Sequence, residues 1–331
     1  MTASIDNATQ SITAYNRGRD PQRLERKFRL LRADAFAFFR GTCHLFYATL
    51  PREAIFRTAP RVLACGDLHL ENFGTYKGDN RLAYFDLNDF DEAAVVPCTL
   101  ELVRFMSSLL LAAAQYKIDA RDAVKLCRRF CDTYRDAVAD GKPRWIERLT
   151  AEGMVRDLLD SLRERKRGEL LARRTRLDKN GRRLVIDEEH ALPAPPAEQR
   201  RIKTLLARYA RTTSDAGFYR VLDVAKRIAG NGSLGVERYV LLVEGKGSPD
   251  SNYLLDLKLA LPSALASQAK VRQPRWPCEA QRVVAVQRVM QAIAPARLAV
   301  IEDGARSYVL KELQPAADRL DLNASHGHLS R

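Results

Sequence analysis

Two short apolar runs in residues 61–92 each end in acidic or amide residues, and this arrangement constrains the fold more than any other feature. RVLA leads into CGDLHLEN, and further on RLAYF leads into DLNDFDE. Apolar runs of this length bounded by turn residues are typical of short strands. Turn formation is the alternative explanation for the acids, and it accounts for Asp79. It accounts poorly for Asp86, Asp89 and Asp91, because acids gathered at one strand end repel one another unless a cation lies between them.

The same residue types meet the requirements of phosphoryl transfer. Asp67 and Asn72 lie in the loop after the first strand, and Asp86 ends the second strand. One carboxylate orients or deprotonates an acceptor hydroxyl, while an amide and a second carboxylate supply oxygens to Mg²⁺, which keeps waters and phosphate oxygens as its other ligands. We therefore expect a catalytic Asp67 and metal binding by Asn72, Asp86 and Asp89. His69 is expected to brace the loop.

The composition predicts an ordinary soluble protein. Apolar residues make up 46% of the chain and charged residues 29%, which excludes wholesale disorder. The longest apolar run, 105–114, has about half the length of a membrane span, and the amino terminus lacks the apolar run of a secretory signal. The six cysteines have no metal-ligand spacing. Thiols without a signal sequence indicate a reducing compartment, so we expect a cytoplasmic protein without a membrane span.

Half of the net charge of +14 lies in one segment. Arg163–Arg183 contains ten Lys or Arg residues and three acidic residues. Such a segment can bind an anionic partner through counterion release. No aromatic residues interleave with the arginines, so the stacking platform of a single-strand nucleic-acid site is not expected. The alternative is a solvated helix followed by a hairpin that turns at 179–181, within a basic insert of about 163–190.

The predicted secondary structure changes from helical to β-rich after about residue 215. Three prolines at 193–196 mark a junction, and alternating apolar runs from about 218 onward predict strands, with a final hairpin turning at Asp303. We expect a helical region at 1–215 and a β-rich region at 216–331. Helices are predicted within 20–50, 99–116, 120–172, 197–211 and 278–293.

A glycine-rich loop with the pattern GxGxxG occupies residues 230–235. A Rossmann turn would open a helix, but a strand, 236–243, follows here, so the loop is expected between strands, where its amides can close over phosphates. The next strand contains Lys258 in LDLKLA. An exposed lysine on an edge strand is the alternative, although its leucine neighbours favour burial. The expected phosphate-binding residues are Gly230, Gly232, Ser233, Gly235 and Lys258.

These motifs resemble a known superfamily. GDLHLEN, followed by the strand ending at Asp86, resembles the catalytic loop and metal-binding Asp of kinase-like phosphotransferases, in the form found in aminoglycoside and choline phosphotransferases. More narrowly, GDLHLENFG and FDLNDFDEA, followed by Pro97 and Arg104, resemble the bacterial domain-of-unknown-function family 2252 (DUF2252) over about residues 28–112. Glu101 departs from the family, which more often has Asp at this position.

The resemblance implies an α+β, bilobal, protein-kinase-like fold that uses ATP and Mg²⁺. In the usual order the glycine loop and its lysine precede the catalytic loop, whereas here the catalytic loop comes about 160 residues earlier. We therefore expect a circular permutation, with the helical catalytic region first. The resemblance also implies adenine binding by backbone near Glu312 and Leu313 and a supporting role for Arg104. It implies that Glu279 pairs with Lys258, although a helix-capping carboxylate would look the same.

The preferred hypothesis is an ATP- and Mg²⁺-dependent phosphotransferase with an unknown small-molecule or protein acceptor. Nucleotidyl transfer from the same site is an alternative, since both reactions need the same cradle for a metal triphosphate. A second alternative is a non-catalytic ATP-binding module that docks an acidic partner or nucleic acid through Arg163–Arg183. The combination of Asp67, Asn72, Asp86 and Lys258 counts against this alternative, because a binding module needs no base.

Overall fold

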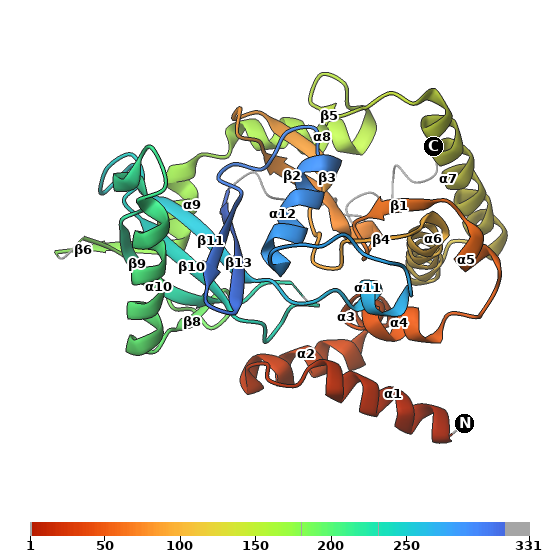
Figure 1. Ribbon diagram of the computed structural model, residues 1–331. Helices are drawn as coiled ribbons and strands as arrows, with labels where there is room; N and C mark the ends of the chain where they lie inside the picture. The colour runs from red at the N-terminus through yellow and green to blue at the C-terminus, as the bar shows by residue number, and fades with distance from the viewer. Residues whose placement is uncertain (1, 180, 231, 315–331) are drawn as a thin grey trace.

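The structure, a computed structural model, describes residues 2–179, 181–230 and 232–314 (Figure 1). The described residues form a mixed α+β fold, as expected from the sequence. Its helices are α1 (Thr2–Tyr15), α2 (Pro21–Ala33), α3 (Ala35–Gly41), α4 (Cys43–Thr49), α5 (Ile55–Thr58), α6 (Cys98–Gln115), α7 (Ala120–Asp140), α8 (Gly153–Ser161), α9 (Arg167–Arg174), α10 (Pro196–Ala210), α11 (Ala264–Gln268) and α12 (Glu279–Met290).

The strands are distributed among four sheets. The largest has six antiparallel strands in the order β12-β13-β11-β10-β9-β8, and the smaller ones pair β1 with β4, β2 with β3 and β5, and β6 with β7. The strands are β1 (Arg61–Ala64), β2 (Phe73–Lys77), β3 (Ala83–Leu87), β4 (Ala94–Pro97), β5 (Ile146–Glu147), β6 (Thr175–Asp178), β7 (Gly181–Leu184), β8 (Ala191–Pro193), β9 (Val221–Arg227), β10 (Arg238–Val243), β11 (Tyr253–Leu259), β12 (Ala299–Asp303) and β13 (Arg306–Glu312).

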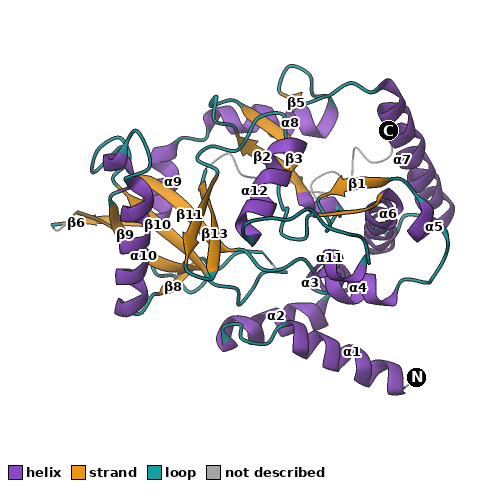
Figure 2. Cartoon of the chain, in the orientation of Figure 1, coloured by secondary structure: helices purple, strands orange, loops and turns teal. Residues whose placement is uncertain are grey.

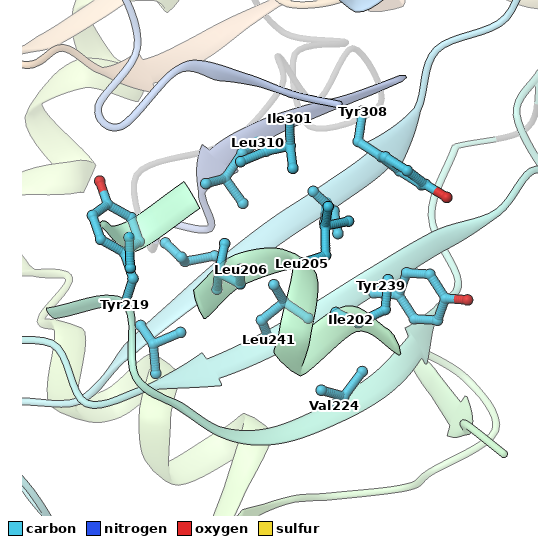
Figure 3. Close-up of a cluster of buried hydrophobic side chains, with 14 of the residues drawn as sticks. Ile202, Leu205, Leu206, Tyr219, Val224, Tyr239, Leu241, Ile301, Tyr308 and Leu310 are labelled. Atoms are coloured by element: carbon cyan, nitrogen blue, oxygen red, sulfur yellow. The ribbon is translucent and has the colours of Figure 1, made fainter. Parts of the chain in front are cut away.

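One face of the six-stranded sheet is apolar and covered by α10 (Figure 3). Ile202, Leu205 and Leu206 lie at helical spacing on α10 and pack against Leu241 and Leu310 of the sheet. All five side chains are almost fully buried. Burial of a side chain of this size contributes about 1.5–3 kcal/mol, so this layer holds the sheet rigid and turns its other face toward the rest of the molecule.

Helix α12 connects the sheet to the helical part of the protein. The six-stranded sheet with α10 lies on one side, α6 and α7 lie on the other, and α12 lies between them (Figures 1 and 2). Val283 and Val284 of α12 belong to one buried cluster with Phe90 and with Phe105 of α6. Gln291, just after α12, donates a hydrogen bond to the carbonyl of Leu87 at the end of β3 (2.6 Å). The acidic loop after β3 is therefore fixed against α12.

Among the described helices, α6 is long and apolar enough to cross a membrane. Its side chain Arg104 is fully buried and ion-paired to Asp67, and the helix packs against α7 and α3. These contacts are those of a core helix.

The sequence predicted most of these elements. The strands expected at RVLA, RLAYF, 236–243 and 253–260 are β1, β3, β10 and β11, and the hairpin at Asp303 is β12–β13. Strands β2 and β4 were not predicted. The region boundary expected at 215 lies inside a packed unit, because β8 and α10 precede it and pack with strands that follow it.

The basic segment forms helix α9 and the β6–β7 hairpin, as the solvated-helix alternative predicted. Residue 180, in the expected turn, lies outside the described residues. Leu170 and Leu171 of α9 are buried and pack with Val240 of the large sheet, so this segment is anchored on the protein. Four of its eight arginines are exposed, and the other four are half-buried.

Candidate active site

A cavity of about 430 Å³ lies between the charged face of the six-stranded sheet and the loops around β2 and β3. We call it the central cavity. It brings together segments that are far apart in the sequence, namely 69–91, 227–238, 256–258 and 309–314. Eight of the residues expected from the sequence line it: His69, Asn72, Asp89, Gly230, Ser233, Lys258, Glu312 and Leu313.

Asp67 lines a smaller neighbouring pocket of about 60 Å³, which we call the Asp67 pocket. Asp89, Asp91 and Ser233 line both spaces, so the two adjoin at the acidic loop. Tyr15 and Arg19 contribute to the wall of the Asp67 pocket. Gly232 also lines the Asp67 pocket and not the central cavity. The structure therefore places Asp67 on one side of Asp89 and Asp91, and Lys258 on the other.

The backbone at Gly66 determines where Asp67 lies. Gly66 has a φ of +88°, and an added Cβ would lie 2.5 Å from the carbonyl carbon of Glu92 and closer still to its oxygen. Its amide donates to Glu101 Oε1 (3.0 Å), and its carbonyl accepts from the Tyr47 hydroxyl (2.7 Å). Glu101, where the family more often has Asp, therefore braces the loop directly.

Arg104 holds the carboxylate of Asp67. Its Nε and Nη2 atoms lie 2.6 and 2.5 Å from Asp67 Oδ1, and Nη2 also donates to the carbonyl of Phe39 (3.0 Å). The guanidinium lies 4.1 Å from the Phe39 ring centroid. Burial opposes the charge of Arg104, but the carboxylate of Asp67 raises its pKa above the usual value. Arg104 is thus a positioning residue for Asp67, which agrees with its expected supporting role.

His69 lies between Asp67 and Asn72 in the loop after β1. Its ring is buried and packs edge-on against Phe36, with centroids 6.2 Å apart. Burial lowers the pKa of His69 to about 4, so the imidazole is neutral at pH 7. This placement is consistent with a brace for the loop.

Asn72 mainly holds backbone. Its Nδ2 donates to the carbonyls of Asp67 (3.1 Å) and Asp89 (3.2 Å), and its Oδ1 accepts from the amides of Asn88 (3.2 Å) and Asp89 (2.8 Å). The amide therefore ties the Asp67 loop to the acidic loop. We expected Asn72 to bind metal, but its oxygen is already occupied by two amide donors, so in this conformation it acts as a brace.

Asp89 and Asp91 face the cavity, whereas Asp86 does not line either space. Asp86 accepts a hydrogen bond from the amide of Leu87 (2.7 Å), and burial raises its pKa to about 6. Burial alone would also raise the pKa of Asp89, but the ammonium groups of Lys258 and Lys311 lower it to about 2. The electrostatic environment therefore favours an anionic Asp89, and Asp86 lies behind it on β3.

Lys258 ion-pairs with the acidic loop. Its Nζ contacts Asp91 Oδ2 and lies 4.0 Å from Asp89 Oδ1. Burial opposes its charge, but these two carboxylates raise its pKa above the usual value. The expected partner Glu279 lies elsewhere, in the first turn of α12, where it accepts a hydrogen bond from Arg282 (2.7 Å). Glu279 is thus paired with Arg282 in the first turn of α12, where the helix dipole favours an acidic side chain.

Arg282 of α12 holds the backbone of the acidic loop. Its guanidinium donates to the carbonyls of Ala93 (2.8 Å), Asp91 (2.9 Å) and Leu261 (2.9 Å). The side chain is almost fully buried. No local pattern in the sequence indicates this role of Arg282, because its acceptors are main-chain groups and two of them, Ala93 and Asp91, lie about 190 residues away.

The amino-terminal helices hold the glycine loop in place. Arg19 donates to the carbonyls of Gly232 (2.8 Å) and Leu234 (3.2 Å), and Lys27 donates to the carbonyl of Gly232 (2.9 Å). Lys27 is fully buried, and burial lowers its pKa to about 7. The amide of residue 20 donates to the carbonyl of Gly235 (2.9 Å). Carbonyls of this loop thus point toward α1 and α2. Position 231, in the middle of the loop, lies outside the described residues.

The segment after β13 joins the sheet to β2. Gln314 accepts from the amide of Lys77 (2.7 Å) and donates to its carbonyl (3.1 Å), which mimics a strand pairing. The amides of Glu312 and Leu313 donate to Ala296 and Leu254, so both are already used within the fold. The Glu312 carboxylate accepts from Arg81 (2.7 Å).

Among the described residues, no group of three or more His, Cys, Asp or Glu side chains is arranged to hold a metal ion. Two carboxylates, Asp89 and Asp91, nevertheless face one cationic group, the Lys258 ammonium. Magnesium typically takes one or two protein carboxylates and completes its shell with water and phosphate oxygens. This donor set therefore fits a magnesium ion that arrives with a phosphate ligand.

Comparison with known families agrees with the narrower resemblance. A family model described as "Uncharacterized protein conserved in bacteria (DUF2252)" matches residues 19–329. The protein belongs to this family. Searches of the curated proteins and of the solved structures found no significant match.

Proposed function

We propose that this protein is an ATP- and Mg²⁺-dependent phosphotransferase with a circularly permuted, kinase-like fold. The observation that carries the proposal is the pairing of Lys258 with Asp91 and Asp89, which joins the lysine of the glycine-loop sheet to acids 167 residues away. Kinase-like transfer needs a lysine that binds phosphates directly opposite acids that bind metal. These groups come from two parts of the sequence that lie far apart.

The order of elements in the second half of the chain supports the kinase-like interpretation. The glycine loop connects β9 to β10, Lys258 follows on β11 as the third strand of this run, and then come α11, α12, β12, β13 and Gln314. In protein kinases the glycine loop and a lysine on the third strand occur in this order. The loop with Asp67 precedes them here, and Gln314 after β13 is hydrogen-bonded to Lys77 of β2, which supports a permutation.

The two adjoining spaces suit the two substrates. The central cavity has cationic side chains on its sheet side, Lys258 among them, which fit the phosphate chain of ATP. The Asp67 pocket adjoins it at Asp89 and would receive the acceptor. A hydroxyl group placed there lies between Asp67 and the terminal phosphate. The pocket is small, so it receives the reacting group of an acceptor whose remainder lies outside.

The transfer step then follows from these positions. The acceptor oxygen bonds to the γ-phosphorus of ATP, the bond from that phosphorus to the β,γ-bridging oxygen breaks, and ADP leaves with the bonding electrons. Asp67 accepts the proton of the acceptor hydroxyl, and Arg104 keeps its carboxylate in place. Lys258 releases Asp91 and binds phosphate oxygens. Asp89 and Asp91 would hold Mg²⁺, which supplies charge neutralisation on the phosphates when bound.

A thermal-shift titration with Mg·ATP tests the proposal. A ligand that binds only the native state at 100 times its Kd stabilises it by about 2.7 kcal/mol, so the melting temperature of the wild type rises. Lys258→Met should show less than half of this rise. Lys226→Met is the matched control, because Lys226 lies on β9 of the same sheet and ion-pairs with Glu198 instead (3.2 Å). An unchanged melting temperature of the wild type at millimolar Mg·ATP would contradict the proposal.

A further inference from the structure

The cavity-facing side of the sheet carries more buried charge than the proposed transfer step uses. We call this group the basic cluster: Arg227, Arg238, Asp256 and Lys311. Asp256 is only 1% exposed and accepts from both Nε (2.7 Å) and Nη2 (2.5 Å) of Arg238. It also ion-pairs with Arg227 (2.7 Å). These two guanidinium groups hold the pKa of Asp256 far below its usual value although burial opposes this.

Lys311 has no comparable partner. Asp256 faces it across the β11–β13 pairing but is already bound by two arginines. The side chain of Lys311 is partly exposed to the cavity and forms no hydrogen bond or ion pair with the residues that the structure describes. Burial lowers the pKa of Lys311, and the carboxylates of Asp256 and Asp89 oppose this lowering. The cationic side chains of Arg227, Arg238 and Lys311 thus lie around the Asp256 carboxylate on the cavity side of the sheet. Asp256 already binds the two arginines, so the Lys311 ammonium can bind an anion in the cavity.

An anion bound at Lys311 would also lie near Lys258. Lys311 and Lys258 line the same cavity, and they belong to neighbouring strands in which Asp256 pairs with Lys311. Such diagonal neighbours are about 7–8 Å apart at Cα, a span that a chain of phosphates can bridge. The sheet between them presents charged side chains to the cavity. This surface suits phosphate oxygens better than a stacked nucleobase.

We propose that Lys311 and the two arginines of the basic cluster bind the phosphate chain of the substrate, so that the site recognises a polyphosphate group with little dependence on the base. The inference rests on the proposed function, because it places the nucleotide in the central cavity. It names the ligand class more closely: a triphosphate of any nucleobase, or inorganic tripolyphosphate, fits the same cations. Lys258 binds the phosphate next to the acidic loop, and Lys311 binds one further along.

Calorimetric titration of the full-length protein tests the inference, with Mg·ATP, Mg·GTP and inorganic tripolyphosphate as ligands. We expect the three to bind with affinities within about tenfold of one another, and tripolyphosphate to displace ATP. Lys311→Met should weaken all three at least about tenfold, since a charge-assisted hydrogen bond is lost. Lys311→Arg should retain most of the affinity, and Lys226→Met should retain all of it.

The possible failures are distinguishable. If Mg·ATP binds but tripolyphosphate does not displace it, or if Lys311→Met leaves the affinity unchanged, the inference is wrong and the proposed function stands. If neither Mg·ATP nor tripolyphosphate binds the wild type, both the inference and the proposed function are wrong. If Lys311→Met does not fold, the comparison of the three ligands on the wild type still decides whether the base matters.

Discussion

Replacement of Gly66 by alanine should be among the most destabilising single changes in the amino-terminal half. The backbone at this position has a φ of +88°, which costs an L-residue about 1–2 kcal/mol. The new Cβ would also overlap the carbonyl of Glu92. That carbonyl cannot withdraw freely, because it accepts a hydrogen bond from Ser263 (2.9 Å). We therefore expect Gly66→Ala to lower the free energy of unfolding by at least about 3 kcal/mol.

Gly141→Ala is the matched control. Gly141 ends α7 with a φ of +64°, and an added Cβ there would meet nothing within 4 Å. The control variant thus has the backbone penalty without the clash. We expect its free energy of unfolding to fall by about 1 kcal/mol. Urea unfolding followed by circular dichroism gives both values from the midpoint shift at constant slope. Equal losses in the two variants would refute the argument that Gly66 is required by its close approach to Glu92.

Three further predictions concern the rest of the site. Asp67→Asn should lower ADP formation at least about 100-fold while Mg·ATP affinity stays within about twofold, by steady-state assay and calorimetry; equal effects on both would contradict a role in transfer. The ring of His44 stacks on that of Tyr15 (centroids 3.9 Å apart), and burial lowers the pKa of His44 to about 4. Below pH 6.5 the imidazole is therefore protonated in the unfolded chain but not in the folded one, so the free energy of unfolding falls between pH 6.5 and 4. His44→Phe should reduce this acid loss by up to about 3 kcal/mol in urea unfolding at several pH values, and an unchanged profile would contradict it. Arg282→Met should lower the free energy of unfolding by about 3 kcal/mol, because three carbonyls lose their hydrogen-bond donor. The control Arg288→Met should lower it by about 1 kcal/mol, because only the carbonyl of Leu298 loses its donor (3.0 Å). Similar losses of stability in the two variants would contradict the bracing role of Arg282.

The elements and the residue types of the site could be predicted because they depend on local patterns. Apolar periodicity of 3.6 marks α6 and α10, and the alternation in LDLKLA marks β11. The spacing of Asp67 from Asn72 and the position of the glycine loop between two strands are also local. These features were enough to bring Asp89 and Lys258 to one expected site, and the structure places them 4.0 Å apart.

The roles of individual polar groups could not be predicted, because they depend on contacts between distant segments. Asn72 has the residue type and spacing of a metal ligand, yet the approach of the acidic loop turns its amide into a backbone brace. Asp91 and Arg282 depend on how α12 packs against that loop. Lys311 stands in a strand whose sequence, YVLKEL, resembles any half-buried strand, and only the β11–β13 register places it beside Asp256.

A double-mutant cycle on Mg·ATP affinity tests the central claim most directly. The claim is that Lys258 and the acidic loop form one phosphate site, although 167 residues separate Lys258 from Asp91. Calorimetry on the wild type, Lys258→Met, Asp91→Asn and the double variant gives the coupling free energy between the two positions. We predict that both single variants bind Mg·ATP more weakly and that their effects depart from additivity by at least about 1 kcal/mol. Additive effects within about 0.5 kcal/mol, or a wild type that does not bind Mg·ATP, would contradict the account.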